Sequence, residues 1–279
     1  MRLGVHVSIA GKLSKAVERA EALGCTAMQI FSRSPRGWAV PDMDPEEIKR
    51  FRELREKADI RPLAIHASYL INLASSDPTL HQRSADALIE ELIRAGRLGA
   101  DYLVVHVGST KGPVRSGIDQ VVKALERVLE SAPRSTVMLL ENTAGEQGDV
   151  GSRLEELGEI LSRLNGENEL GICLDTCHLF AAGYDIRKKA GVKALARTVE
   201  GNIGVERVRL IHVNDSKKGL GCRVDRHQHI GQGGIGLEGF RAWVNHPAFR
   251  DIPMVLETPK DSPTADPQNL KMIRSLRVA

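Results

Sequence analysis

The chain has 279 residues, 42% of them hydrophobic and 27% charged, and its formal net charge at pH 7 is +3. This composition is typical of globular proteins and excludes disordered, collagen-like and coiled-coil chains. No apolar run approaches the ~20 residues that cross a bilayer, and residues 1–12 do not form the pattern of a signal peptide. The four cysteines are irregularly spaced, which argues against a disulfide framework, so we expect a cytoplasmic protein.

Short apolar runs, rich in Val, Ile and Leu, predict the β-strands. Runs that are apolar at nearly every position are typical of parallel strands covered on both faces. In chain order the predicted strands span 3–7, 27–31, 62–66, 102–106, 137–141, 171–175, 208–213 and 253–257.

Amphipathic segments separate these runs. Their apolar residues recur at spacings of three and four, which predicts helices. The clearest helical segments span 12–24, 45–58, 87–99, 118–130, 152–164 and 266–277. Eight strand–helix units predict an α/β fold, specifically a (β/α)8 TIM barrel with a single domain over 1–279. A doubly wound open sheet is the alternative, but it normally has fewer strands at this length.

Six successive predicted strands, beginning with the third, each end in a side chain that can bind a metal. In a barrel the carboxyl ends of the strands converge on the rim where active sites of this fold lie. One such residue would be interpreted as a satisfied buried polar group. Six together would repel one another and lose hydration unless bound cations compensated them. The six are His66, His106, Glu141, Asp175, His212 and Glu257.

Three further residues extend this set to nine predicted ligands. His178 follows Asp175 by three positions, and Asp225 and His227 share a face in the long irregular segment 214–236. Imidazole and carboxylate ligands without a required thiolate favour Zn²⁺, with Mn²⁺ or Fe²⁺ as substitutes. The set has four carboxylates, so three divalent ions would leave it net positive, which suits an anionic phosphate substrate.

Three other residues near the predicted rim are expected to support the site without binding a metal. His6 ends the first strand and is expected to hydrogen-bond to a ligand. Cys173 and Cys177 flank Asp175, and we interpret them as small buried side chains rather than as ligands.

Ordered sequence blocks along nearly the whole chain resemble the endonuclease IV family, the zinc-dependent apurinic/apyrimidinic endonucleases of base-excision repair. The family's fold is an eight-stranded α/β barrel, in agreement with the strand count. The blocks are GVHVSIAGKL, IHASYLINLAS, VVHVGS, LLENTAG, LDTCHLFAAGYD, IHVNDSKKGLGCRVDRHQHIGQGGIG and LETP.

The resemblance implies hydrolysis of the phosphodiester 5′ to an abasic site, which leaves a 3′-hydroxyl and a 5′-deoxyribose phosphate. It also implies three zinc ions, with Glu141 bridging two of them and Glu257 orienting or deprotonating the attacking water. The implied ligand sets are His66 and His106 with Glu141; Glu141 with Asp175, His212 and Glu257; and His178 with Asp225 and His227.

The same resemblance places DNA contacts on two loops, 31–38 and 68–76. Arg36, Tyr69 and Leu70 match the positions that enter the minor groove and help to turn the damaged nucleotide out of the stack. The implied partner is therefore double-stranded DNA that contains abasic sites. A monomer is expected, because an asymmetric lesion requires no two-fold symmetry of the protein.

Two alternative functions remain open at this stage. A metal-dependent sugar isomerase or epimerase of the same barrel architecture would also place Glu, Asp and His at strand ends, but it needs neither the His178–Asp225–His227 set nor the loops with Arg36 and Tyr69. A non-catalytic protein that binds damaged DNA would not need a bridging carboxylate.

Overall fold

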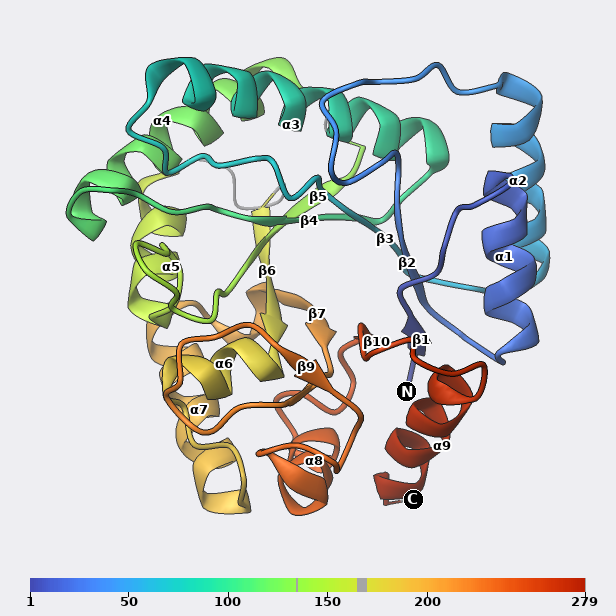
Figure 1. Cartoon of the computed structure of the whole chain (residues 1–279), viewed down its shortest axis with the longest axis vertical. Coiled ribbons are helices and arrows are strands. Elements are labelled where there is room, and N and C mark those ends of the chain that lie inside the picture. The colour runs from blue at the N-terminus through green and yellow to red at the C-terminus, as the bar shows by residue number, and fades with distance from the viewer. Residues whose placement is uncertain (134, 165–169, 279) are drawn as a thin grey trace.

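The computed structural model describes residues 1–133, 135–164 and 170–278. Within these residues, parallel strands form an eight-stranded sheet in the order β1-β10-β7-β6-β5-β4-β3-β2, which curves round into a barrel (Figure 1). Its strands are β1 (Leu3–Val5), β2 (Met28–Phe31), β3 (Leu63–His66), β4 (Tyr102–His106), β5 (Val137–Glu141), β6 (Leu170–Asp175), β7 (Val208–His212) and β10 (Met254–Leu256).

Helices follow the strands and cover the outside of the barrel (Figure 1), so the (β/α)8 TIM barrel predicted from the sequence is confirmed. None of the helices in the described ranges combines the length and the apolar character needed to cross a bilayer. They are α1 (Leu13–Ala22), α2 (Pro45–Lys57), α3 (Pro78–Leu98), α4 (Val114–Ser131), α5 (Leu154–Arg163), α6 (Thr176–Ala182), α7 (Lys189–Asn202), α8 (Gly236–Asn245) and α9 (Ala265–Leu276), with a 3₁₀ turn η1 at Val205–Arg207.

The barrel closes where β1 meets β2. His6 pairs with Gln29 in a parallel bridge, and the amide of Val7 donates to the carbonyl oxygen of Gln29 at 2.7 Å. The two strands approach closely at Gly4, where a Cβ atom would lie 1.8 Å from the carbonyl oxygen of Ala27. Glycine is therefore required at position 4 for the barrel to close in this way.

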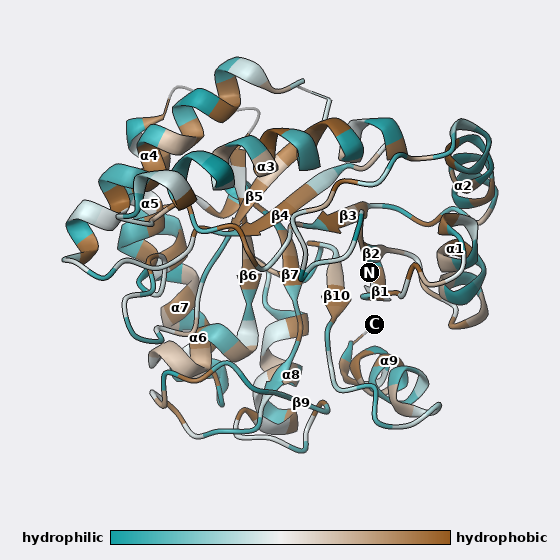
Figure 2. Cartoon of the chain, turned by 45° about the horizontal axis from the view of Figure 1, so that its top comes forward, coloured by the Kyte–Doolittle hydropathy of each residue, from teal (hydrophilic) through white to brown (hydrophobic). Residues whose placement is uncertain are grey.

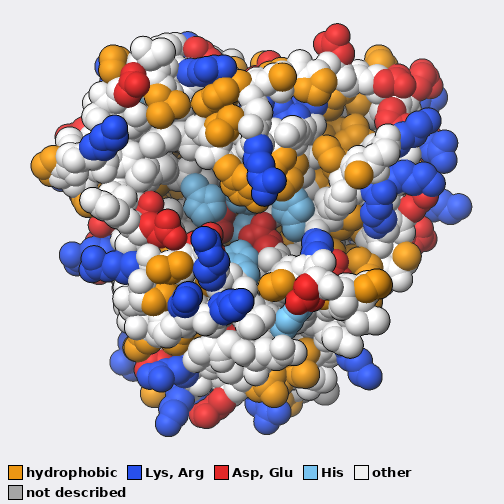
Figure 3. All heavy atoms as spheres, in the orientation of Figure 1, with side chains coloured by type: hydrophobic (Ala, Val, Ile, Leu, Met, Phe, Trp, Pro, Cys, Tyr) orange, Lys and Arg blue, Asp and Glu red, His pale blue; other side chains and the backbone are white. Residues whose placement is uncertain are grey.

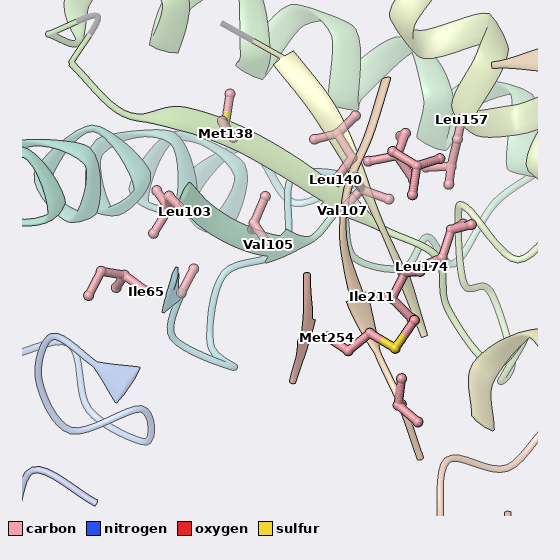
Figure 4. Close-up of a cluster of buried hydrophobic side chains, with 14 of the residues drawn as sticks. Ile65, Leu103, Val105, Val107, Met138, Leu140, Leu157, Leu174, Ile211 and Met254 are labelled. Carbon is pink, nitrogen blue, oxygen red and sulfur yellow. The ribbon is translucent and has the colours of Figure 1, made fainter. Parts of the chain in front are cut away.

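Side-chain alternation along the strands separates two apolar clusters. The larger cluster lies between the sheet and the helices, and Figure 4 shows part of it with Val105 and Leu140 from strands and Leu157 from α5. Figure 2 shows apolar strands surrounded by helices with both apolar and hydrophilic residues. The smaller cluster lines the barrel interior with Ala64, Val104, Leu139, Cys173, Leu210 and Val255, all fully buried.

This interior ring positions the candidate site. Each ring residue comes two positions before one of the six predicted strand-end ligands, and residues two apart on a strand point to the same face. The six ligands therefore stand directly above an apolar floor, pointing into the barrel axis.

Two features differ from the sequence-based expectations. Helix α3 begins at Pro78, well before the predicted start at residue 87, because Asp77 caps it by accepting from the amides of Thr79 and Leu80. The segment 214–236, expected to be irregular, contains an antiparallel pair of short strands, β8 (Asp215–Ser216) and β9 (His227–Gln228).

Candidate metal centre

The structure brings all nine predicted ligands to the carboxyl ends of the strands. Figure 3 shows histidine and acidic side chains together in a hollow at the centre of the molecule, with basic side chains beside it. A cavity of about 410 Å³ opens there, lined by His66, Tyr69, His106, His178 and Asp225 among others. Potential ligand atoms lie within 4.8 Å of one another in five groups of the described residues, two of which include Cys173 or Cys177. The three groups without cysteine are His66, His106 and Glu141; Glu141, Asp175, His212 and Glu257; and His178, Asp225 and His227.

Glu141 lies between the groups and is fully buried. Its Oε2 lies 3.2 Å from Nε2 of both His66 and His106, while its Oε1 lies 2.8 Å from Nδ1 of His212. Burial opposes the charged carboxylate, but attraction to His106 and His212 outweighs burial and holds the pKa of Glu141 well below its ordinary value. One carboxylate thus presents an oxygen to each of two neighbouring groups.

In three histidines a main-chain contact determines which ring nitrogen carries the proton and which one faces the centre. Each Nδ1 lies within hydrogen-bond distance of a main-chain carbonyl oxygen, which can only accept, so Nδ1 carries the proton and Nε2 faces the centre. The contacts are His66 Nδ1 to Ala67 O at 2.8 Å, His178 Nδ1 to Asn142 O at 3.0 Å, and His227 Nδ1 to Glu257 O at 3.0 Å.

With the proton on Nδ1, the lone pairs on Nε2 of His178 and His227 face the carboxylate of Asp225. Nε2 of His178 and of His227 each lie 3.2 Å from an oxygen of Asp225, yet both nitrogens are buried without a hydrogen bond. A lone pair set against an anionic oxygen is repulsive unless a proton or a cation lies between them. The donor set therefore fits a divalent cation with imidazole and carboxylate ligands.

When no cation is bound, protons on the neighbouring imidazoles balance the negative charge of the carboxylates. Burial opposes a charge on His227, but Asp175 and Asp225 outweigh it and raise the pKa of His227 to about 9. In the same way Asp175 and Asp225 raise the pKa of His178 well above its ordinary value against the effect of burial. Cation binding therefore competes with protonation of these imidazoles.

Two asparagines that sequence reasoning missed hold the carboxylates in place. Asn142 Oδ1 accepts from the amide of Asp175 at 2.7 Å. Asn214 Nδ2 donates to Asp175 Oδ2 at 2.7 Å, and Asn214 Oδ1 accepts from the amide of Glu257 at 2.8 Å. The available signal was their position, since each asparagine follows closely after a strand-end ligand.

Asp215 was also missed, and it folds the long segment back onto the barrel. Its buried carboxylate accepts from the amides of Gly231, Gly233 and Ile235 at 2.9–3.0 Å. Gly233 allows this approach, because a Cβ atom there would lie 2.4 Å from the carbonyl oxygen of Ser216. The glycine-rich end of the segment is thereby tied to β8, which follows β7 after two residues.

The cysteines behave as the sequence predicts. All four are free, and Cys173 and Cys177 are buried. Burial raises the pKa of Cys173 to about 12, which favours the neutral thiol over the thiolate. His6 also matches its expected role, since its Nδ1 lies 3.3 Å from Oε1 of Glu257.

The two loops with the predicted DNA contacts are joined at Pro35. Its carbonyl oxygen accepts from Ser68 Oγ at 2.8 Å and from the amide of Tyr69 at 3.2 Å. Tyr69 is 60% exposed, Arg36 is exposed, and Leu70 is half-buried. An apolar ring and a cation therefore project beside the centre.

A family described as xylose isomerase-like TIM barrel matches residues 17–277. "Probable endonuclease 4" of Methanoculleus marisnigri is 45% identical over 276 residues, 98% of each chain. The crystal structure of endonuclease IV from Thermus thermophilus superposes with a TM-score of 0.87 and 41% identity, covering 99% of this chain and 98% of that one. A D-tagatose 3-epimerase-like protein shares the fold at 21% identity and a TM-score of 0.76, covering 99% of this chain and 97% of its own.

Proposed function

The chain belongs to the endonuclease IV family, and from that membership we propose that it is a DNA-repair endonuclease that hydrolyses the phosphodiester on the 5′ side of an abasic site. The products are a 3′-hydroxyl and a 5′-deoxyribose phosphate. The observation that carries the proposal is the His178–Asp225–His227 group beside the strand-end ligands, with buried imidazole lone pairs directed at carboxylates.

The nine clustered side chains are proposed to hold three zinc ions, for which Mn²⁺ or Fe²⁺ can substitute. The ligand chemistry supports a divalent metal, and the three cysteine-free groups of atoms within 4.8 Å agree with this number of ions. Such ions supply Lewis-acid activation of water and neutralise the charge that develops on a phosphate.

The protein side chains then orient the reacting groups. Glu141 is proposed to bridge two ions, because its two oxygens face different histidines. Glu257 is proposed to orient or deprotonate the attacking water. Its Oε1 accepts from Gln29 Nε2 at 2.7 Å, whereas its Oε2 lies 3.2 Å from Nδ1 of His212.

DNA recognition is assigned to the exposed loops. Arg36, Tyr69 and Leu70 are proposed to enter the minor groove, where an aromatic wedge unstacks base steps and stabilises a flipped nucleotide. Tyr69 is suited to this role because its ring is held by an edge contact with Phe31, at a centroid distance of 5.4 Å. The substrate is double-stranded DNA with an abasic site, and we propose that a cytoplasmic monomer acts on it.

The epimerase alternative is supported only by fold. Its structural neighbours are distant in sequence, and an epimerase has no use for the exposed Tyr69 loop. The test is incubation of zinc-loaded protein with a duplex that carries one tetrahydrofuran abasic analogue. We expect incision 5′ to the lesion, its loss after prolonged chelation, and its recovery with zinc. An undamaged duplex of the same sequence is the control, and intact lesion strands with fully metallated protein would rule the function out.

A further inference from the structure

We infer that Gln29 of β2 is a positioning residue that determines which ring nitrogen of His212 faces the candidate metal centre. This inference rests on the proposed function, because it concerns the orientation of two proposed ligands, His212 and Glu257. Gln29 is fully buried, and it is a polar residue within an otherwise apolar strand. A buried amide is retained in such a place only when its donors and acceptors are satisfied.

The carboxylate of Glu257 determines how the amide of Gln29 is turned. Gln29 Nε2 lies 2.7 Å from Glu257 Oε1 and 3.0 Å from Nδ1 of His6. The reversed amide would place its oxygen at that same 2.7 Å from an anionic oxygen, which is strongly repulsive. The NH₂ group therefore faces Glu257, and the amide oxygen faces the other way.

That oxygen in turn determines the tautomer of His212. Gln29 Oε1 lies 2.8 Å from His212 Nε2, and an amide oxygen can only accept, so Nε2 carries the proton. The lone pair then belongs to Nδ1. This nitrogen lies 2.8 Å from Glu141 Oε1 and 3.2 Å from Glu257 Oε2, and so faces the centre.

His212 is held differently from the other histidines with assigned tautomers. His66, His178 and His227 donate through Nδ1 to main-chain carbonyls, which remain whatever the neighbouring side chains are. His212 presents the opposite nitrogen and depends on a side chain, Gln29, for the proton on Nε2. Its ligating tautomer can therefore be changed by a single substitution.

The place of Gln29 in the barrel fixes this contact in space. Its main chain forms the closing bridge with His6, and its carbonyl oxygen accepts from Val7 at 2.7 Å. The residues directly after β1 thus hold the backbone of Gln29, while its side chain reaches two proposed ligands, His212 at the end of β7 and Glu257 directly after β10. Outer contacts of this kind typically change metal affinity by about 10–100-fold.

The experiment uses zinc alone as the probe. Gln29→Met keeps the approximate length of the side chain but removes both polar groups. We expect at least one zinc equivalent to bind about 10–100-fold more weakly in competition with a chromophoric chelator. We also expect ¹⁵N spectra of labelled histidine to show mixed protonation of the His212 ring, assigned against His212→Asn. Gln82→Met, an exposed change on α3, is the matched control and should leave both readouts unchanged.

A second variant separates the tautomer from packing. Gln29→Glu retains an acceptor for His212, so the Nε2–H signal should persist, although repulsion of Glu257 weakens zinc binding. If Gln29→Met does not fold, loss of this signal in folded Gln29→Glu overturns the inference. Wild-type zinc affinity and a single His212 tautomer in Gln29→Met also overturn it. If folded wild-type protein binds no zinc, the proposed function itself is wrong. This result differs from normal zinc binding in both wild type and Gln29→Met, which would contradict only the role of Gln29.

Discussion

Glu91 of α3 forms a buried ion pair with Arg33, the second residue after β2. Arg33 Nε donates to Glu91 Oε1 at 2.8 Å, and each side chain is 1% exposed. The same guanidinium donates through Nη1 to the carbonyl oxygens of Gly37 at 2.8 Å and Ala39 at 3.3 Å. Arg36 lies within the span that these bonds close, so the loop that presents it is held by a charge pair sheltered from water.

Replacing Glu91 with Gln should therefore affect both stability and DNA binding. Loss of one partner leaves the buried guanidinium of Arg33 without its counter-charge, which typically costs about 3–5 kcal/mol. We expect a fall of this size in the free energy of unfolding, measured in urea, and weaker binding to abasic duplex with unchanged zinc content. Glu90→Gln, at a partly exposed position on the same helix, is the control. Wild-type stability in Glu91→Gln would contradict this account.

Glu141→Gln should be more damaging than His178→Ala. The carboxylate of Glu141 approaches ligands of two groups, whereas the imidazole of His178 contributes chiefly to the group with Asp225 and His227. Both variants should lose at least ~100-fold in single-turnover incision, with Glu141→Gln showing the greater loss of metal. Zinc content is measured on the same samples. A normal zinc count together with a normal rate in Glu141→Gln would overturn the bridging role.

Tyr69→Ala should weaken lesion recognition and leave the metal centre intact. Unstacking costs a few kcal/mol per base step, so removal of the wedge should reduce affinity for abasic duplex by about 10–100-fold. Single-stranded abasic DNA should suffer less, because its bases are already unstacked. Tyr69→Phe retains the ring and serves as the control. Equal affinities of Tyr69→Ala and wild type for abasic duplex would show that the ring only packs the loop.

The raised pKa of Asp149 should make the free energy of unfolding depend on pH. Burial raises the pKa of this carboxyl from 3.8 to about 6, although the hydrogen bond from the amide of Glu146 opposes this shift. Between these pH values the folded protein binds the extra proton, so this contribution to stability is present at low pH and is lost as the pH rises through about 6.

Asp149→Asn should remove that dependence. At about pH 7.5 we expect the variant to be more stable than wild type by about 1 kcal/mol, a figure reduced because the side chain is half-buried and partly screened. At about pH 4, close to the ordinary pKa of an aspartate, the two proteins should be alike. Urea unfolding at both pH values measures the difference, with the exposed Asp42→Asn as control. A stability difference that is the same at both pH values would show that the titration is unimportant.

The strand-end ligands could be predicted because strand geometry is strictly alternating. Once Val104 and Leu139 are recognised as interior residues, His106 and Glu141 must point to the same side. Helix boundaries were harder to predict from the sequence. The start of α3 depended on a capping Asp77 outside the apolar periodicity, and α6, α7 and α8 were not singled out.

Gln29 and Asp215 could not be predicted for a different reason. Their roles depend on hydrogen bonds to residues far away in the chain, His212 for Gln29 and Gly231 with Gly233 for Asp215. A sequence shows that a polar residue interrupts an apolar strand, but not which partner compensates it. The conformation of segment 214–236 follows from such contacts rather than from local preference.

The contacts of Asp215 also bear on the order in which the candidate ligands come together during folding. Six of the candidate ligands stand at or directly after strands of the sheet and reach their places as the barrel closes. Asp225 and His227 reach theirs only after the chain beyond Asp215 has looped out and returned, and ordering a long loop is a late and entropically costly step. We therefore expect the six strand-end ligands to assemble before Asp225 and His227, and we expect the segment with these two ligands to open more readily in the native protein than the strand ends do.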